Sequence, residues 1–396
     1  MKNFSNENII FKGKKVLLRV DLNVPMKNGS ITESSRIEKI LPTIKMLLEK
    51  ETKIIILSHI GRPKGKFVKG MSLEPISKKL SSLLNKDVLF YKNIINDNTL
   101  SEVNKIQNGS IMMLENIRFN PGEESNDSEF SKKLSNLGDI YINDAFSCSH
   151  RSHASVEGIT KYIPSYFGLQ ITQEIEALKK ITSEIIKPVS LIIGGSKIST
   201  KISIINNLAK KFDNIIIVGG MANTMLKHTG YKIGKSICEN DCESLIKDIL
   251  DISKKFNCKI VCPIDVVVSK SIEGVGKNKD IKEINDDEMI LDIGPKTISS
   301  IKKIINDSNT VLWNGPAGYF ENPNFQTGTK EILEIITQKT INDKIFSVAG
   351  GGETVAAINK FKKFDSFTFV STAGGAFLEY LEGKTLPGIK ALNQNV

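Results

Sequence analysis

The first half of the chain carries cationic side chains placed where they could bind a small, multiply charged anion. Each one lies in or just after a segment that follows a predicted strand, and they are Arg36, His59, Arg62, Arg118 and Arg151. Guanidinium groups make rigid bidentate contacts with phosphate and carboxylate, and lysine greatly outnumbers arginine elsewhere in this chain. Taken singly, each arginine reads as a surface or helix-capping residue. Five such cations without matching local carboxylates favour a polyanionic substrate.

Two further pairs of polar residues near these cations allow more than one interpretation. Asp21 and Asn23 could hydrogen-bond hydroxyls of the same substrate, or could serve the turn that precedes Pro25. His150 and His153 have an H-x2-H spacing, which we interpret as loop histidines near an anion site rather than as metal ligands.

The second half of the chain is rich in glycine turns that follow predicted strands and open predicted helices. The five turns are Gly194–Gly195, Gly219–Gly220, Gly315–Gly318, Gly350–Gly352 and Gly374–Gly375. Glycine lets the backbone approach a ligand closely, and a helix N-terminus offers unpaired N–H groups to phosphate. One such turn is ordinary connection chemistry, but five in one half favour a phosphate-rich ligand.

Two common nucleotide-binding signatures are missing from these turns. None matches the Walker A pattern or G-x-G-x-x-G, so a P-loop NTPase and an ordinary NAD-binding enzyme lose their main support. Lys197 and Lys201 lie four residues apart just after the first turn. On a helix they share one face, which could point to a phosphate chain or simply be solvated.

Short apolar, β-branched runs alternate with longer amphipathic stretches, which predicts an α/β fold built on parallel sheets. The predicted strands are 16–20, 53–58, 110–114, 139–143, 189–193, 214–218, 259–268, 310–313, 344–348 and 366–371. The predicted helices are 37–49, 72–84, 202–212, 241–256, 328–337 and 355–361. The polar stretches 120–128 and 269–287 are expected to be surface loops.

At 396 residues the chain is long enough for two domains. The segment 173–187 has a helical apolar pattern that Pro188 should end, and a new strand follows at once. We therefore expect a linking helix and hinge at 173–188 between two lobes.

The composition bounds the class of protein. No run of 18 apolar residues and no signal-peptide pattern is present, so we expect a cytoplasmic protein. The formal charge of +10 is spread among acidic residues, which disfavours nucleic acid as the main partner. Four of five cysteines form two C-x3-C pairs, Cys238/Cys242 and Cys258/Cys262, but a strand at 258–268 would hold its two thiols too far apart for zinc.

Long motifs in consecutive order resemble the phosphoglycerate kinase family from about residue 9 to about residue 390. The motifs of the first half are RVDLNVP at 19–25, SHIGRP at 58–63, LENIRF at 114–119 and NDAFSCSHRSHAS at 143–155. Those of the second half are IIGGSKISTK at 192–201, VGGMA at 218–222, WNGPAGYFE at 313–321, AGGGET at 349–354 and STAGGAFLEYLEGKTLPG at 371–388.

The resemblance implies two lobes, each a doubly wound six-stranded parallel sheet flanked by helices, joined by a hinge helix. The phosphoglycerate-binding lobe would be 1–172 with about 379–396, and the nucleotide-binding lobe 189–378. The implied phosphoglycerate contacts are Asp21, Leu22, Asn23, Arg36, His59, Ile60, Gly61, Arg62, Arg118 and Arg151. The implied nucleotide contacts are Lys197, Lys201, Gly219, Gly220, Gly294, Asn314, Glu321, Gly350, Gly351, Gly352, Glu353 and Thr354.

The implied reaction is reversible phosphoryl transfer between 1,3-bisphosphoglycerate and ADP, giving 3-phosphoglycerate and ATP in a monomeric enzyme. Its carboxylate acceptor is ionised at neutral pH and needs no general base. We expect Arg36, Lys201 and Mg²⁺ to neutralise the phosphoryl group in flight, supported by Gly374 and Gly375, after domain closure. The alternatives are a Rossmann-type NAD-dependent oxidoreductase and a non-catalytic, basic nucleic-acid-binding protein.

The chain departs from the family pattern at two positions. Glu353 stands where the family usually has Asp, at the residue expected to approach the Mg²⁺-nucleotide. Ala373 replaces the first glycine of a GGG turn, which would cost energy only if that position requires a positive φ.

Overall fold

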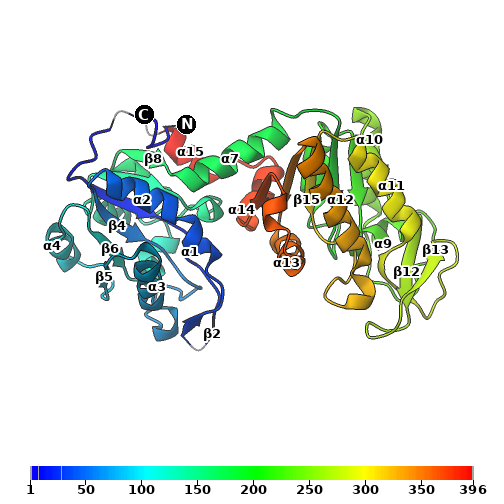
Figure 1. Ribbon diagram of the computed structural model, residues 1–396, viewed down its shortest axis with the longest axis horizontal. Helices are drawn as coiled ribbons and strands as arrows, with labels where there is room; N and C mark the ends of the chain where they lie inside the picture. The colour runs from blue at the N-terminus through cyan, green and yellow to red at the C-terminus, as the bar shows by residue number, and fades with distance from the viewer. Residues whose placement is uncertain (1, 8, 28, 395–396) are drawn as a thin grey trace. The chain divides into compact units, whose positions relative to one another are not determined.

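The computed structural model describes residues 2–7, 9–27 and 29–394 (Figure 1). The chain divides into two compact units, which are described separately below. One comprises the residues up to Ile175 together with those from Thr385 onward, and the other comprises Glu176–Lys384. The division falls within helix α7 (Leu169–Thr182). This helix begins and ends earlier than the predicted 173–187 segment, and Pro188 is therefore not what ends it. The residues after Thr182 leave the apolar pattern, and Ile186 is exposed.

The first unit is built on a six-stranded parallel sheet with the order β5-β6-β4-β1-β7-β8. The strands are β1 (Lys15–Arg19), β4 (Lys53–Leu57), β5 (Val88–Tyr91), β6 (Ile111–Leu114), β7 (Ile140–Asn143) and β8 (Ser165–Phe167), with a small hairpin of β2 (Met26–Lys27) and β3 (Ser30–Ile31). The central strands are apolar on both faces because helices cover both.

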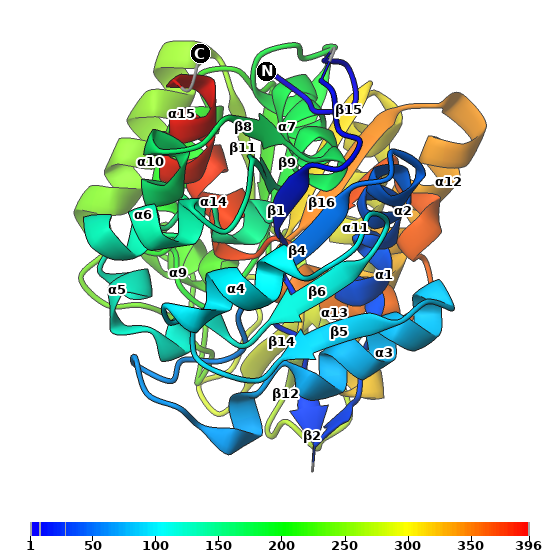
Figure 2. The same ribbon diagram turned by 90° about the vertical axis from the view of Figure 1, so that its left-hand side faces the viewer.

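Helices lie on the two faces of this sheet as the chain order requires. The helices are α1 (Ser35–Lys39), α2 (Leu41–Glu49), α3 (Glu74–Leu84), α4 (Asn98–Asn104), α5 (Pro121–Glu124), α6 (Ser128–Ser135) and α15 (Pro387–Gln394). Apolar residues of α1, α2 and α3 pack on one face of β1, β4 and β6 in one continuous core. Figure 2 shows these three helices on one side of the sheet and α4, α5 and α6 on the other.

The second unit has a six-stranded parallel sheet with the order β11-β10-β9-β15-β16-β17. Its strands are β9 (Val189–Ile193), β10 (Asn214–Ile217), β11 (Lys259–Val261), β15 (Thr310–Asn314), β16 (Phe346–Gly350) and β17 (Phe369–Ser371). Its helices are α8 (Ile202–Leu208), α9 (Gly219–His228), α10 (Glu243–Phe256), α11 (Pro295–Asn306), α12 (Thr327–Asp343), α13 (Gly352–Lys360) and α14 (Gly375–Leu381). Residues of α11, α12 and α13 form one core with Trp313 and its neighbours on the sheet. The predicted α/β fold with two six-stranded parallel sheets is confirmed.

Three sequence predictions about connecting segments were wrong. The predicted strand 259–268 is two strands in different sheets, β11 and β12 (Asp265–Ser269), so Cys258 and Cys262 flank a short strand rather than share a long one. The predicted loop 269–287 contains β13 (Lys277–Asp280). This strand pairs with β12, which pairs on its other side with β14 (Met289–Ile293) in an antiparallel sheet. The predicted loop 120–128 contains α5, where Glu123 is fully buried. Polar composition misled us in the last two cases, because partners distant in sequence satisfy those polar groups.

Candidate active site

In the first unit, the strand order brings the predicted anion-binding residues to one edge of the sheet. Strand β1 lies between β4 and β7 and pairs with both in parallel, so their carboxyl ends meet. Asp21 and Asn23 follow β1, the His59–Arg62 segment follows β4, and Arg151 follows β7. In open α/β sheets, ligands bind outside the carboxyl ends of the strands where the strand order reverses. The fold therefore places these residues at the expected binding edge.

Asp21 anchors Arg36 at this edge. Arg36 Nη1 donates to Asp21 Oδ2 at 2.5 Å, and the Ser147 hydroxyl donates to the same oxygen. Burial alone would raise the pKa of the Asp21 carboxyl, but the charge of Arg36 and the hydrogen bond from Ser147 hold it below its usual value. Asp21 is therefore an ionised carboxylate that fixes the position of a guanidinium group.

The His59–Arg62 segment is held between the ends of β1 and β6. The Gly61 N–H donates to Asn23 Oδ1 at 3.0 Å, and Arg118 Nη1 donates to the Gly61 carbonyl at 2.7 Å. Gly61 has a φ of 63°, and an added Cβ would lie 2.8 Å from Met71 Sδ, so the turn requires glycine. Of the remaining predicted contacts, Leu22 and Ile60 are buried and Arg62 is exposed.

The cations at this edge perturb one another. Burial and the charges of Arg118, Arg19 and Arg151 lower the pKa of His153 to about 3. Burial and Arg19 lower the pKa of Arg118, and Arg151 adds to the effect. Bringing the charges of Arg19, Arg118 and Arg151 together costs free energy, which the ion pair of Arg118 with Glu124 offsets in part.

A metal ion suits this cluster less well than an anion. Ligand atoms of Asp21, His59 and Cys148 lie within 4.8 Å of one another. However, Arg19 donates to His59 Nδ1 and Arg36 donates to the Asp21 carboxylate, so a metal ion would have to compete with two guanidinium groups for these ligand atoms.

Several residues of this region escaped the sequence analysis, namely Arg19, Glu123, Ser147, Cys148 and Ser155. Arg19 and Glu123 are fully buried, which their residue types do not predict. One signal was available for Arg19: all five arginines of the chain lie in the first unit, and Arg19 is the only one within a strand.

In the second unit, the order of strands reverses between β9 and β15, and two glycine turns meet there. Gly315 has a φ of 111°, and an added Cβ would lie 2.3 Å from the Gly194 carbonyl oxygen. A Cβ on Gly194 would likewise lie 2.3 Å from the Pro316 carbonyl oxygen. Glycine is required at both positions because the two backbones touch.

Lys201 and the end of β16 are joined through one asparagine. Lys201 Nζ donates to Asn314 Oδ1, and Asn314 Nδ2 donates to the Gly350 carbonyl at 2.6 Å. Burial lowers the pKa of the Lys201 ammonium, and the nearby Glu353 carboxylate opposes that shift. The Thr354 hydroxyl accepts from the Gly315 N–H at 2.7 Å. The network connects the turns after β9, β15 and β16.

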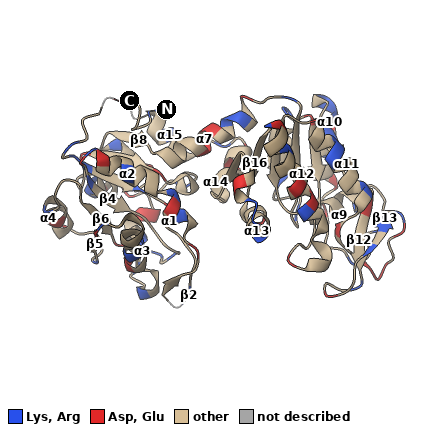
Figure 3. Cartoon of the chain, in the orientation of Figure 1, with Lys and Arg blue, Asp and Glu red and all other residues tan. Residues whose placement is uncertain are grey.

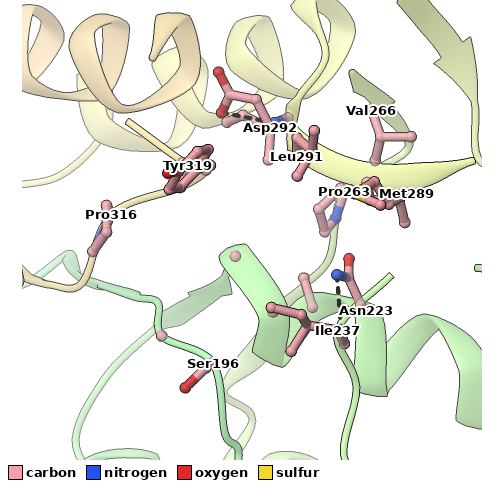
Figure 4. A pocket seen from close by; sticks show the side chains of 18 of the residues that line it. Ser196, Asn223, Ile237, Pro263, Val266, Met289, Leu291, Asp292, Pro316 and Tyr319 are labelled. Atoms are coloured by element: carbon pink, nitrogen blue, oxygen red, sulfur yellow. Dashed lines mark hydrogen bonds between the residues drawn. The ribbon is translucent and has the colours of Figure 1, made fainter. Parts of the chain in front are cut away.

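A mainly apolar cavity of about 570 Å³ lies beside these turns (Figure 4). Figure 4 shows Pro316 and Tyr319 from the segment after β15, Leu291 and Met289 from β14, and Asn223 from α9 around it. Gly219, Gly220, Glu321 and Glu353 are the predicted nucleotide residues in its lining. Burial raises the pKa of Asp292, also in the lining, to about 7, although its carboxylate accepts from the Gly328 and Ile293 N–H groups. Its size and apolar lining suit a nucleotide base.

The remaining predicted nucleotide residues lie at helix starts or at the surface. Lys197 is exposed and lowers the pKa of Glu239, which is mainly held down by hydrogen bonds from Ser199 against a burial effect. Gly294 precedes α11 as its N-cap residue, and Gly374, predicted to support the transferring group rather than to bind nucleotide, precedes α14 in the same way. Gly374 has a φ of 56°, whereas Ala373 is not among the positive-φ residues of the described chain. Alanine at 373 is therefore free of that strain.

Comparisons with known proteins identify the class and then the family. Two doubly wound units, one with a cationic strand edge and one with a glycine-lined cavity, define a nucleotide-dependent transferase. A profile of the family "Phosphoglycerate kinase" matches residues 6–384. Phosphoglycerate kinases of Chelativorans sp. (strain BNC1) and Rhizobium meliloti (strain 1021) are each 46% identical over 384 residues, covering 96% of both chains.

Solved structures agree with these sequence matches. The phosphoglycerate kinase of Coxiella burnetii superposes with a TM-score of 0.91 at 40% identity, covering 99% of this chain and 98% of the other. That of Pyrococcus horikoshii OT3 superposes with a TM-score of 0.84 at 30% identity, covering 100% and 99%. The chain belongs to the phosphoglycerate kinase family.

The family assignment establishes the reaction. The protein is a phosphotransferase with a carboxyl group as acceptor, and it interconverts 1,3-bisphosphoglycerate and ADP with 3-phosphoglycerate and ATP. The oxidoreductase and the non-catalytic alternative are thereby excluded as its main role. No helix within residues 2–7, 9–27 and 29–394 is long and apolar enough to cross a membrane.

Proposed function

We propose that the first unit binds the phosphoglycerate through its cationic strand edge and that the second binds the nucleotide. Arg36, Arg118 and Arg151 gather near the carboxyl ends of β1, β6 and β7, and this arrangement carries the first part of the proposal. A phosphate and a carboxylate together would offset the repulsion among these cations. Asp21, Asn23, Arg36, His59, Arg62, Arg118 and Arg151 would be the contacting side chains, with Leu22, Ile60 and Gly61 supplying backbone.

For the nucleotide, the cavity beside Gly219 and Gly220 would hold the base and Glu321 would lie near the sugar. Lys197, Lys201, Asn314 and the Gly350–Thr354 turn would lie along the phosphates, where the N–H groups at the start of α13 can donate. Gly294 would contribute to the walls of the site, and Gly374 and Gly375 would donate N–H groups to the transferring group.

In this mechanism the protein aligns two anions and neutralises charge. The acceptor carboxylate is already ionised, so no side chain has to remove a proton. Arg36 and Lys201 would stabilise the charge on the phosphoryl group during transfer. Mg²⁺, when bound with the nucleotide, would add charge neutralisation. Glu353 fits such an ion because it is an exposed carboxylate in the first turn of α13, and Mg²⁺ is commonly held by one carboxylate and substrate phosphates.

Substrates bound to separate units must meet for transfer to occur. We therefore propose closure about the 173–188 segment, in a monomer that works in the cytoplasm. Five free cysteines are in keeping with a reducing compartment. Figure 3 shows Lys and Arg interspersed with Asp and Glu in each unit, a pattern that favours small anionic substrates over nucleic acid as partners. Small-angle scattering with both substrates should show compaction, and unchanged dimensions would contradict closure.

One experiment separates the two proposed binding surfaces. Arg62→Met should weaken 3-phosphoglycerate binding roughly ten- to a hundredfold, as expected for loss of a hydrogen bond between charged groups. Its nucleotide affinity should not change. Titration calorimetry measures both, and Lys66→Met, another exposed cation of the same loop, serves as control. If Arg62→Met weakened nucleotide binding instead, the assignment of the two units would be wrong.

A further inference from the structure

The fully buried Arg19 contacts a predicted substrate-binding residue without being exposed itself. It is the last residue of β1. Its Nη2 lies 3.1 Å from His59 Nδ1 and 3.6 Å from Cys148 Sγ. Its Nη1 donates to the Val20 carbonyl. Three nitrogens of one guanidinium thus point in fixed directions, and one of them is aimed at the imidazole.

A chain of hydrogen bonds at Nε fixes the orientation of the Arg19 guanidinium. Arg19 Nε donates to Ser155 Oγ at 3.0 Å, and Ser155 Oγ donates to Glu123 Oε1 at 2.6 Å. The Ser155 N–H donates to the other Glu123 oxygen at 2.9 Å. Glu123 is fully buried, so its carboxylate serves this network rather than solvent.

The contact with Arg19 decides which nitrogen of His59 carries a proton. A guanidinium has only donors, so Nδ1 must accept. A neutral imidazole that accepts at Nδ1 carries its hydrogen on Nε2. The ring cannot become a cation without placing an N–H against the guanidinium.

The charges around His59 act in the same direction. The groups facing it are Arg19 from β1, Asp21 after β1, Arg118 after β6, and Cys148 and His153 after β7. Burial and then Arg19 lower the pKa of His59 well below its usual value, Asp21 opposes them, and Arg118 and His153 lower it further.

We propose that Arg19 is a positioning residue that locks His59 as a neutral imidazole with its proton on Nε2, so that His59 offers phosphoglycerate one fixed hydrogen-bond donor. The inference rests on the proposed role of His59 as a phosphoglycerate contact. Arg19 itself does not touch the substrate. Its consequence is that His59 binds the anion equally well across the physiological pH range, because its protonation does not change there.

The first test uses the wild-type protein. Its four histidines give a small set of imidazole signals in ¹⁵N-edited NMR, and His59→Gln identifies those of His59. The signals should show the Nε2–H tautomer with no titration between about pH 5.5 and 8, where an ordinary histidine changes charge. A protonated Nδ1, or titration in that range, would overturn the proposal without any change to the fold.

The second test removes the donor. Arg19→Met should weaken 3-phosphoglycerate binding about tenfold near pH 8, the effect of losing one well-placed hydrogen bond to a charged group. The loss should be smaller towards pH 6, because removing the charge of Arg19 raises the pKa of His59 and favours a protonated ring that attracts the anion. A purely structural role would give a pH-independent loss. Ser155→Ala removes the acceptor that fixes Arg19 Nε and so loosens the contact of Nη2 with His59. It should show a weaker form of the same pH dependence and serves if Arg19→Met does not fold.

Two outcomes distinguish failure of the proposed His59 contact from failure of the proposed role of Arg19. If His59→Gln binds 3-phosphoglycerate like wild type, the proposed contact itself is wrong. If His59→Gln binds weakly but Arg19→Met leaves the tautomer and the pH profile of binding unchanged, only the role of Arg19 is refuted.

Discussion

Replacement of Lys201 by methionine tests the proposed stabilisation of the phosphoryl group. Methionine keeps much of the length and apolar character of the lysine stem but removes its charge. A unit charge about 4 Å from another, at an effective dielectric constant of about 20, contributes about 4 kcal/mol. Because Lys201 is half-buried and burial already lowers the pKa of its ammonium, solvent screens that interaction incompletely. We expect kcat to fall roughly 10²–10³-fold, the usual effect of losing one such contact.

The assay must separate catalysis from stability. The change also removes the donor to Asn314 Oδ1, and Asn314 is buried, so about 1–3 kcal/mol of folding free energy can be lost as well. Coupled turnover is therefore measured well below Tm, together with ADP affinity by calorimetry. Lys210→Met, an exposed lysine just after α8, is the matched control, and Lys201→Arg should recover part of the rate. A folded Lys201→Met variant with kcat within about threefold of wild type would refute the reasoning.

Three other predictions follow from single observations. Gly351→Ala should lower the free energy of unfolding by about 1–3 kcal/mol, because Gly351 has a φ of 98° and a Cβ would lie 2.5 Å from Asn314 Nδ2. Gly352→Ala is the control and should be tolerated, since no atom lies within 4 Å of its Cβ. Equal losses of the two variants in thermal unfolding would contradict the prediction. Asp292 has a pKa raised to about 7, so the folded state binds more protons than the unfolded state between about pH 4 and 7. The free energy of unfolding should therefore fall with rising pH by up to about 4 kcal/mol more in wild type than in Asp292→Asn. If urea unfolding gave parallel pH profiles for the two proteins, the raised pKa of Asp292 would be excluded. Glu353→Asp should change the Mg²⁺ dependence of ADP affinity, since one methylene separates the two carboxylates; an unchanged dependence would mean that Glu353 does not approach the metal.

Residue types and local spacing were sufficient to predict much of the fold and of the candidate site of this protein. β-Branched runs identified most strands of both parallel sheets, because strands buried on both faces must be apolar throughout. Arginines and glycines after strands indicated the two kinds of ligand, because parallel strands bring their carboxyl ends to one edge. The extended motifs then made the family recognisable from the sequence alone.

Tertiary structure decided what depends on partners far apart in the chain. Glu123 lies in a stretch that looked like a surface loop, yet it is buried because Ser155 donates to it twice. The 269–287 stretch forms β13 only because β12 is there to pair with it. Arg19 was overlooked as part of an apolar strand, and its contact with His59 exists because β1 and β4 are neighbours in register. Which cations meet, and which proton His59 carries, depend on this pairing of strands and not on the spacing of residues in the sequence.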